Sequence, residues 1–454
     1  MAALHPFSRH FSLFLPVRLS LLLSVLHPLR RTVGFGTLLL MILVPAASAD
    51  TIIHAGRVFD ATSAKILKEQ TLRVKGDRIV ARTRGYAPAG AEDTLIDLRD
   101  STVMPGWIDM HVHISQQLSP GAYAERFKSG PADAALRGAA YAERTLMAGF
   151  TTVRDLGTSD GVAQSIRDAV AAGFVAGPRI FTAGKSLATT GGHADPTNGV
   201  RAELREDPGP AEGVVNGVED AYKAVRQRYK EGSDLIKLTA TGGVLSQAKS
   251  GDNPQFTEEE LAAIIGAARD YGYKVAAHAH GAKGMERAIR AGVDSIEHGT
   301  FMTPETIKLM KKMGTYYVPT ILAGEFVAHK AEQPGYFSEL VRPKALAIGP
   351  TIQETFANAY KAGVKIAFGT DSGVSAHGDN WQEFGLMIEA GMPVLVALQS
   401  ATRNAAQLLG EWDDLGSLDA GKYADIVAVP GKLEDNPELF GKTNFIMKNG
   451  VRYR

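Results

Sequence analysis

Short apolar runs of strand length recur through the middle of the chain, and stretches with helical periodicity separate most of them. Two helical stretches are Thr257–Tyr271 and Met285–Ala291, and the first begins with Thr257 and Glu260 in a capping-box pattern. Eight strands alternating with helices over about 300 residues predict an α/β fold, a (β/α)8 TIM-like barrel, at residues 105–415. The predicted strands lie at residues 107–113, 151–156, 179–184, 235–240, 274–280, 295–299, 316–322 and 365–371.

Both ends of the chain carry short strand-like segments that turn residues separate. The Asn449-Gly450 pair is typical of a tight hairpin turn between two of them. We therefore predict a small β-sandwich domain built from residues 50–104 and 416–454 together. The segments that support it lie at residues 51–56, 71–74, 77–80, 424–429 and 445–451.

The first 49 residues are typical of an export signal. The Arg30-Arg31 pair precedes an apolar run from Val33 to Val44, and Ala47-Ser48-Ala49 has the small residues of a cleavage site. The apolar run is too short for a stable transmembrane span, and an uncleaved membrane anchor is the alternative. We expect cleavage near Ala49 and a periplasmic or secreted protein.

Composition narrows the possible chemistry and partners. The sequence has no cysteine, so a metal would have to bind His, Asp, Glu or a modified side chain. Residues 50–454 contain 45 Lys and Arg residues and 49 Asp and Glu residues, and the sequence has no basic tract. This balance argues against a nucleic-acid partner and favours a small-molecule one. A homo-oligomer remains open.

Five of the nine histidines that follow the leader fall at the ends of predicted strands. Barrel enzymes place their active sites at this end of the strands. His111 and His113 are two residues apart on one strand, so both imidazoles face the same side and can bind one ion. Ordinary strand histidines are the alternative for this pair. The five are His111, His113, His278, His280 and His298.

The segment Met104–His113, with the sequence Met-Pro-Gly-Trp-Ile-Asp-Met-His-Val-His, resembles the first-strand motif of the amidohydrolase superfamily. The similarity extends over most of the chain after the leader, up to the closing segment Gly416–Val427. The chain is most similar to the binuclear-zinc group that includes Xaa-Pro dipeptidases, N-acyl-amino-acid hydrolases and ochratoxin-degrading amidohydrolases. Imidazolonepropionases are more distant.

Lys237 lies inside an apolar strand, where a cation is costly to bury. A snorkelling lysine or one paired with an acid is the alternative. The resemblance implies that Lys237 is the fourth-strand lysine that is carboxylated on its amine (N6-carboxylysine) and bridges two metal ions. Carboxylation would replace the cation by an anion with two oxygens.

The resemblance implies a complete ligand set for two Zn²⁺ ions, with Mn²⁺ or Co²⁺ as alternatives. Carboxylated Lys237 and a hydroxide would bridge the ions. Asp371 would also take the proton of the attacking water and pass it to the leaving amine. The metal ligands are His111, His113 and Asp371 for one ion, His278 and His298 for the other, and Lys237 for both.

Residues that would contact the substrate are predicted with less support. His280 is the second candidate catalytic residue beside Asp371, although His278 and His280 could exchange roles. Arg154 and Asp155 are expected to form a supporting ion pair. The candidate substrate-binding residues are Ser115, His193 in the long loop Thr189–Gly217, His280 and Tyr317.

The resemblance implies hydrolysis of an amide bond to a C-terminal amino acid. The substrate would be an Xaa-Pro dipeptide, an N-acyl amino acid or an ochratoxin-like conjugate. A cyclic-amide (imidazolonepropionase-like) or ester hydrolase would keep the same metal site, and a non-catalytic barrel binding protein is a remote alternative.

Overall fold

The computed structural model describes residues 49–454 apart from residue 126. The predicted leader, residues 1–49, lies outside the described residues except for Ala49. Within the described part of the chain, no helix combines the length and apolar character that a membrane crossing requires.

Strands from both ends of the chain join in one sheet, as expected of a small β domain. They form a seven-stranded mixed sheet, in the order β14-β13-β12-β4-β1-β2-β3. Its only parallel pair is β1 with β4. The strands are β1 (Thr51–Asp60), β2 (Lys65–Lys75), β3 (Arg78–Arg84), β4 (Thr94–Pro105), β12 (Ile426–Pro430), β13 (Phe445–Lys448) and β14 (Val451–Arg452).

The predicted tight turn closes the last hairpin of this sheet. Asn449 and Gly450 have φ angles of 49° and 74°. Positive φ at both central residues is the geometry that matches the twist of two antiparallel strands. The turn joins β13 to β14.

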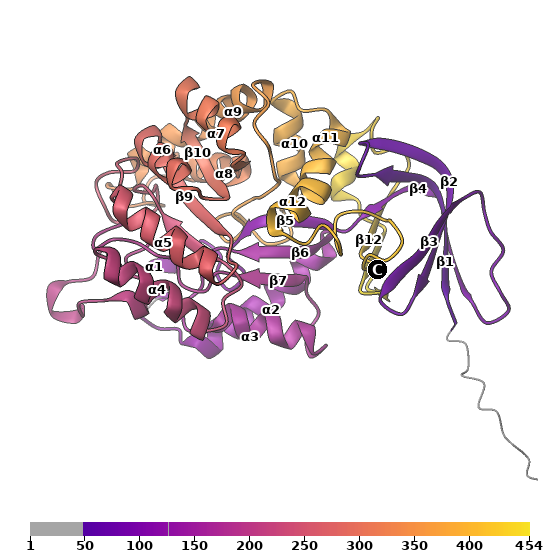
Figure 1. Cartoon of the computed structure of the whole chain (residues 1–454), viewed down its shortest axis with the longest axis horizontal. Helices are drawn as coiled ribbons and strands as arrows, with labels where there is room; N and C mark the ends of the chain where they lie inside the picture. The colour runs from indigo at the N-terminus through magenta and orange to yellow at the C-terminus, as the bar shows by residue number, and fades with distance from the viewer. Residues whose placement is uncertain (1–48, 126) are drawn as a thin grey trace, which may run out of the picture. The chain divides into compact units, whose positions relative to one another are not determined.

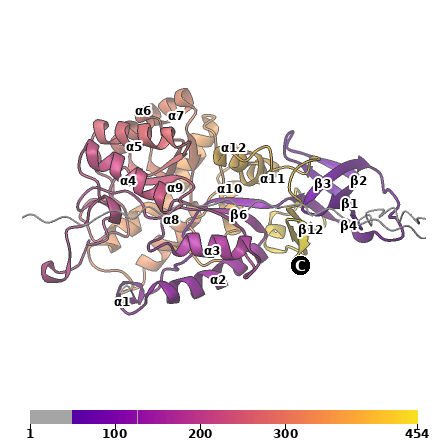
Figure 2. The same ribbon diagram turned by 60° about the horizontal axis from the view of Figure 1, so that its bottom comes forward.

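Seven of the eight predicted central strands are present, in two parallel sheets of three and four strands. Most of their residues are buried, because helices cover the sheets (Figures 1 and 2). The first sheet contains β5 (Trp107–Val112), β6 (Phe150–Asp155) and β7 (Arg179–Thr182). The second contains β8 (Ile236–Thr239), β9 (Val275–Gly281), β10 (Ser295–Phe301) and β11 (Tyr316–Val318).

The eighth predicted strand, residues 365–371, is not a regular strand. Its backbone nevertheless bonds to both sheets: the Met110 N–H donates to the Phe368 carbonyl at 2.9 Å, and the Tyr317 N–H donates to the Lys365 carbonyl at 2.8 Å. The Asp371 N–H donates to the His111 carbonyl at 2.7 Å. The segment therefore lies between β5 and β11, although regular ladders do not close the two sheets into a ring.

The helices alternate with the parallel strands, and α5 begins as its sequence predicts. The Thr257 hydroxyl accepts the Glu260 N–H, and the Glu260 carboxylate accepts the Thr257 N–H. The α-helices are α1 (Ala122–Glu125), α2 (Pro131–Met147), α3 (Val162–Ala171), α4 (Val218–Lys230), α5 (Glu258–Asp270), α6 (Ala282–Ala291), α7 (Pro304–Met313), α8 (Ile321–Ala331), α9 (Arg342–Lys361), α10 (Gln382–Glu389), α11 (Val394–Gln399) and α12 (Ala405–Leu409).

A single residue, Gly106, separates β4 from β5. A Cβ at Gly106 would lie 2.0 Å from the Thr151 hydroxyl oxygen, so only glycine allows this approach to β6. Trp107 is fully buried at the start of β5, and its ring packs edge-on against Phe150 and Phe384 at 5.5 and 5.3 Å. This packing fixes the strand that leads to the histidine pair.

Candidate metal centre

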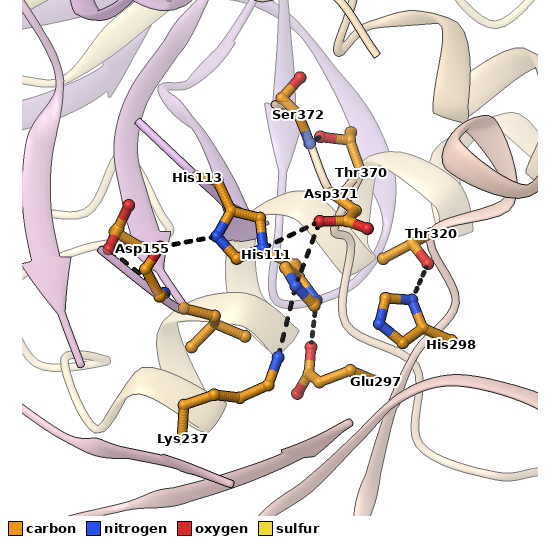
Figure 3. A network of polar contacts seen from close by, with 12 residues as sticks. His111, His113, Asp155, Lys237, Glu297, His298, Thr320, Thr370, Asp371 and Ser372 are labelled. Atoms are coloured by element: carbon orange, nitrogen blue, oxygen red, sulfur yellow. Dashed lines mark hydrogen bonds and ion pairs between the residues drawn. The ribbon is translucent and has the colours of Figure 1, made fainter. Parts of the chain in front are cut away.

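His111, His113 and Asp371 converge where β5 meets residues 365–372 (Figure 3). One ligand atom from each lies within 4.8 Å of the others. The Asp371 Oδ1 atom is 3.2 Å from His113 Nε2 and 3.4 Å from His111 Nε2. This group matches the three residues that were predicted to hold one ion.

The Asp371 Oδ1 atom is buried and has no partner with hydrogen-bond geometry in the described part of the chain. Burial by itself raises the pKa of this carboxyl, but His111, His113 and Lys237 outweigh burial and hold the pKa below its usual value. A buried carboxylate beside two ring nitrogens is a donor set for a divalent cation. The residues present therefore fit a metal ion.

Each of the five strand-end histidines has one ring nitrogen within hydrogen-bond distance of a protein oxygen. Such a bond orients the ring, and where the oxygen is a carbonyl or carboxylate that can only accept, it also places the proton on the bonded nitrogen and leaves the second nitrogen as a ligand atom. The five contacts join His111 Nδ1 to Glu297 Oε2, His113 Nδ1 to the Gly157 carbonyl, His278 Nε2 to the Gly242 carbonyl, His280 Nδ1 to Thr300 Oγ1, and His298 Nδ1 to Thr320 Oγ1, at 2.7 to 3.0 Å.

The partner of His111 is itself held in place. Glu297 accepts from Arg154 Nη2 at 2.9 Å, and both side chains are buried. Burial raises the pKa of Glu297, but Arg154 and then His111 overcome it and bring the pKa to about 2. Glu297 is therefore a carboxylate. Sequence reasoning missed it, although an acidic residue directly before His298 in an apolar strand was a signal.

Arg154 and Asp155 do not pair with each other, contrary to the sequence prediction. Successive residues on a strand point to opposite faces, so their side chains separate. Arg154 reaches Glu297, whereas Asp155 accepts the Ile114 N–H at 2.8 Å and the hydroxyls of Thr158 and Thr182.

Lys237 is buried on β8, with 4% of its surface exposed. Its Nζ atom lies 3.4 Å from His111 Nε2 (Figure 3). Burial lowers the pKa of the lysine to about 8, although Glu297 and Asp371 act in the opposite direction. Burial therefore favours the neutral amine over the ammonium form.

The remaining histidines form a second cluster beside the first. The ring of His298 lies 5.0 Å from that of His111 and 4.8 Å from that of His278, between ring centres. The His193 ring stacks on His278 at 4.2 Å. Burial lowers the pKa of His193, His278, His280 and His298, so their rings are neutral, as metal binding requires of a histidine ligand.

One cavity of about 260 Å³ brings most of the predicted site residues together. Ser115 lines a neighbouring cavity instead. Tyr317 is fully buried behind the site, and its hydroxyl donates to the His298 carbonyl at 2.8 Å. The predicted residues that line the cavity are His111, His113, His193, Lys237, His278, His280, His298 and Asp371.

Three residues at the site have left-handed backbone conformations. The φ angles are 67° at His298, 52° at Thr320 and 57° at Asp371. This conformation costs about 1–2 kcal/mol for an ordinary residue. Non-glycine residues that persist in it cluster at functional sites.

Asp109 links the two segments that form the candidate metal centre, β5 and residues 365–372. Its carboxylate accepts the backbone N–H groups of His111 and Thr370 at 3.0 and 3.1 Å, and the Asn380 side chain donates to it at 2.8 Å. Burial raises the pKa of Asp109 to about 6. Sequence reasoning assigned it no role, although a carboxylate inside an apolar strand was a signal.

Residues 102–451 match the model of the Amidohydrolase family. The chain is 52% identical to a Xaa-Pro dipeptidase crystallised with methionine in its active site, with a TM-score of 0.87 over 89% of this chain and 100% of that one. A prolidase complexed with N-methylphosphonate-L-proline is 32% identical, with a TM-score of 0.82 over 89% and 100%. Ochratoxinase from Aspergillus niger is 33% identical over 409 residues, which are 85% of this chain and 82% of that protein.

The matched region contains the histidine pair, Lys237 and Asp371 and extends nearly to the end of the last strand. The family model matches most of the chain, and the 33% identity to ochratoxinase extends over most of both proteins. Proteins that share only a fold need not have such similar sequences. The chain therefore belongs to the amidohydrolase family and is an enzyme that acts on C–N bonds.

Proposed function

We propose that the enzyme hydrolyses an amide bond to a C-terminal amino acid, with two zinc ions as cofactors. The observation that carries this proposal is the set of five histidines whose rings are each held through one nitrogen around the cavity that Lys237 and Asp371 also line. The dipeptidase with bound methionine and the prolidase with a proline analogue support the substrate class.

The residues that would hold the ions fall into two groups. His111, His113 and Asp371 would hold one ion, and His278 and His298 the other. When bound, the ions supply Lewis acidity that polarises an amide carbonyl and makes hydroxide available near neutral pH.

Lys237 would join the two groups as N6-carboxylysine. Its neutral amine forms a bond from Nζ to the carbon of carbon dioxide and loses a proton, which leaves a carbamate anion. The pKa of about 8 favours this reaction, because only the unprotonated amine is nucleophilic. The carbamate also removes the cost of burying an ammonium group beside His111.

Asp371 would move the proton during hydrolysis. Its carboxylate accepts a proton from the attacking water and passes it to the departing amide nitrogen. Burial lowers the pKa of His193 to about 3 and that of His280 to about 4, so each ring carries one N–H group. Both rings line the cavity and would donate this group to the carboxylate of the substrate, with His280 Nδ1 accepting from the Thr300 hydroxyl.

We also propose that the two parallel sheets and residues 365–372 form the (β/α)8 barrel that the sequence predicts. The backbone bonds of residues 365–371 to β5 and β11 support closure on one side. Residues 105–415 would be the barrel domain, 50–104 and 416–454 the β domain, and 1–49 a cleaved export signal.

The proposal is tested with the zinc-loaded protein and a substrate panel of Xaa-Pro dipeptides, N-acyl amino acids, esters and imidazolonepropionate. We expect turnover of the first two classes, and a loss of about 10²–10⁴-fold in kcat for Asp371→Asn. Rapid turnover of imidazolonepropionate without turnover of acyl amino acids would contradict it.

A further inference from the structure

One side of the catalytic cavity is aliphatic. We call it the aliphatic wall and define it by six residues from α8, α9 and the segment after β8. They contribute methyl and methylene groups and, apart from their backbone, no polar atom. The wall consists of Ala323, Gly324 and Val327 on α8, Ile348 and Ile352 on α9, and Val244.

The start of α8 is tied to the metal centre. Thr320, directly before the helix, hydrogen-bonds His298 Nδ1 through its hydroxyl at 2.7 Å. The Glu383 carboxyl group accepts the N–H groups of Ile321 and Leu322 at 2.9 and 2.7 Å. The position of the α8 part of the wall is therefore set relative to a metal-binding histidine.

Helix α9 is tied to the substrate side of the cavity. The Thr355 hydroxyl donates to the Thr300 carbonyl at 2.6 Å, and the Thr300 hydroxyl bonds His280 Nδ1 at 2.8 Å. Ile352 lies one helical turn before Thr355. The α9 part of the wall therefore has a fixed position relative to His280.

The two helices pack too closely for a larger residue at the centre of the wall. A Cβ at Gly324 would lie 2.7 Å from Ile352 Cγ2 and 3.3 Å from Ile348 Cγ2. A Cβ at Gly349 would lie 2.8 Å from the Cβ of Ala328. The two isoleucines therefore fill the space at the centre of the wall and determine its shape there.

Charge is confined to the metal side of the cavity. Apart from histidines, the charged residues among its described lining residues are Lys237 and Asp371. Lys344 on α9 lies nearby, but its ammonium group already donates to the carbonyls of Gly243, Ser246 and Ala248. A charged group against the wall would therefore be buried without a partner.

We propose that the aliphatic wall is the subsite for the side chain of the substrate's C-terminal amino acid, and that it selects uncharged apolar side chains. This inference rests on the proposed function. His193 lies at the edge of the wall, since a Cβ on Gly243, the neighbour of Val244, would lie 2.1 Å from its ring. A substrate carboxylate at His193 and His280 would direct the adjoining side chain onto the wall.

The test compares N-acyl amino acids that share one acyl group and differ in the C-terminal residue. We expect kcat/KM to rise about fourfold with each methylene from alanine to norleucine. The side chains of methionine and glutamate have similar size. We expect kcat/KM for the glutamate derivative to be about 100-fold or more below that for the methionine derivative. Comparable kcat/KM values for methionine and glutamate would overturn the proposal.

Ile348→Ala tests the wall directly, with Ile265→Ala in α5 as the control because Ile265 is equally buried and does not line the cavity. We expect Ile348→Ala to lower kcat/KM for methionine derivatives about 10-fold or more relative to phenylalanine derivatives, and Ile265→Ala to leave this ratio unchanged. The same ratio in both variants would contradict the proposal.

Binding of free amino acids to the zinc-loaded protein separates this inference from the proposed function. If calorimetry detects methionine but not glutamate and no amide is hydrolysed, the wall is supported and the proposed function is wrong. If amides are hydrolysed without side-chain preference and both amino acids bind equally, the wall is wrong and the proposed function stands.

Discussion

Glu297 Oε2 lies 3.0 Å from His111 Nδ1, and this contact turns His111 Nε2 toward Asp371. Arg154 holds the other carboxylate oxygen. The buried arginine and carboxylate thus position the ring of a candidate metal ligand, although neither of them belongs to the candidate ligand group.

Glu297→Gln should weaken zinc binding about 10–100-fold, because the ring of His111 loses its charged partner and Arg154 loses its counter-ion. Zinc affinity measured by competition with a chelator checks this. Glu286→Gln is the matched control, since Glu286 bonds Arg290 and Thr306 away from the cavity. Unchanged affinity in Glu297→Gln would exclude the supporting role.

Lys237→Ala should abolish tight binding of a bridged metal pair, because the Nζ atom that lies 3.4 Å from His111 Nε2, and with it the proposed bridge, would be lost. The zinc content per chain after dialysis measures this, with the exposed Lys283→Ala as control. A variant that keeps two zinc ions and full activity would show that Lys237 is not a bridge.

Lys344→Met should loosen the segment after β8 while it keeps the apolar stem of the side chain. The three carbonyls of Gly243, Ser246 and Ala248 lose their shared donor, which costs about 1–3 kcal/mol of stability. We expect a raised KM with a smaller change in kcat, and faster proteolysis within residues 242–253. Lys361 is exposed at the end of α9, and Lys361→Met should leave both KM and the rate of proteolysis unchanged.

Glu383 should make the protein less stable as the pH rises. Burial raises its pKa from 4.5 to about 8, although the N–H groups of Leu322 and Ile321 oppose the shift. Between these values the folded state holds a proton that the unfolded state has released, so the unfolding free energy falls with increasing pH.

Glu383→Gln should therefore lose less unfolding free energy than the wild type between about pH 5 and about pH 8. Urea denaturation at both pH values, in the same metal state, measures the difference. Glu354→Gln, exposed on α9, should follow the wild type. Parallel behaviour of Glu383→Gln and the wild type would mean that Glu383 is already ionised when folded.

The apolar runs predicted the central strands well because strands buried on both faces show little polar alternation. All seven residues of β9 are buried, and only its histidines interrupt the run. Residues 365–371 include an apolar run as well but form no regular ladder. Their backbone turns into the left-handed region at Asp371, which no hydrophobic pattern reveals.

The predicted ligands lie close together because the ends of neighbouring parallel strands meet at the same edge of a sheet. The residues that hold these ligands in position, such as Arg154 and Glu297, depend instead on which distant strands become neighbours. Arg154 and Glu297 are 143 positions apart in the chain, so local sequence favoured the wrong partner, Asp155. The strand order of the β domain could not be predicted for the same reason. The parallel pairing of β1 with β4 requires β2 and β3 to lie outside this pair.

Because the backbone is left-handed at His298 and Asp371, the residue types that would be most stable at these two positions are not the ones that activity would require. Glycine or asparagine adopts this conformation at lower cost, so a selection for heat resistance alone would favour them there. Such replacements would also remove two candidate metal ligands. Engineering of a thermostable form should therefore exclude both positions and draw its stabilising changes from elsewhere in the fold.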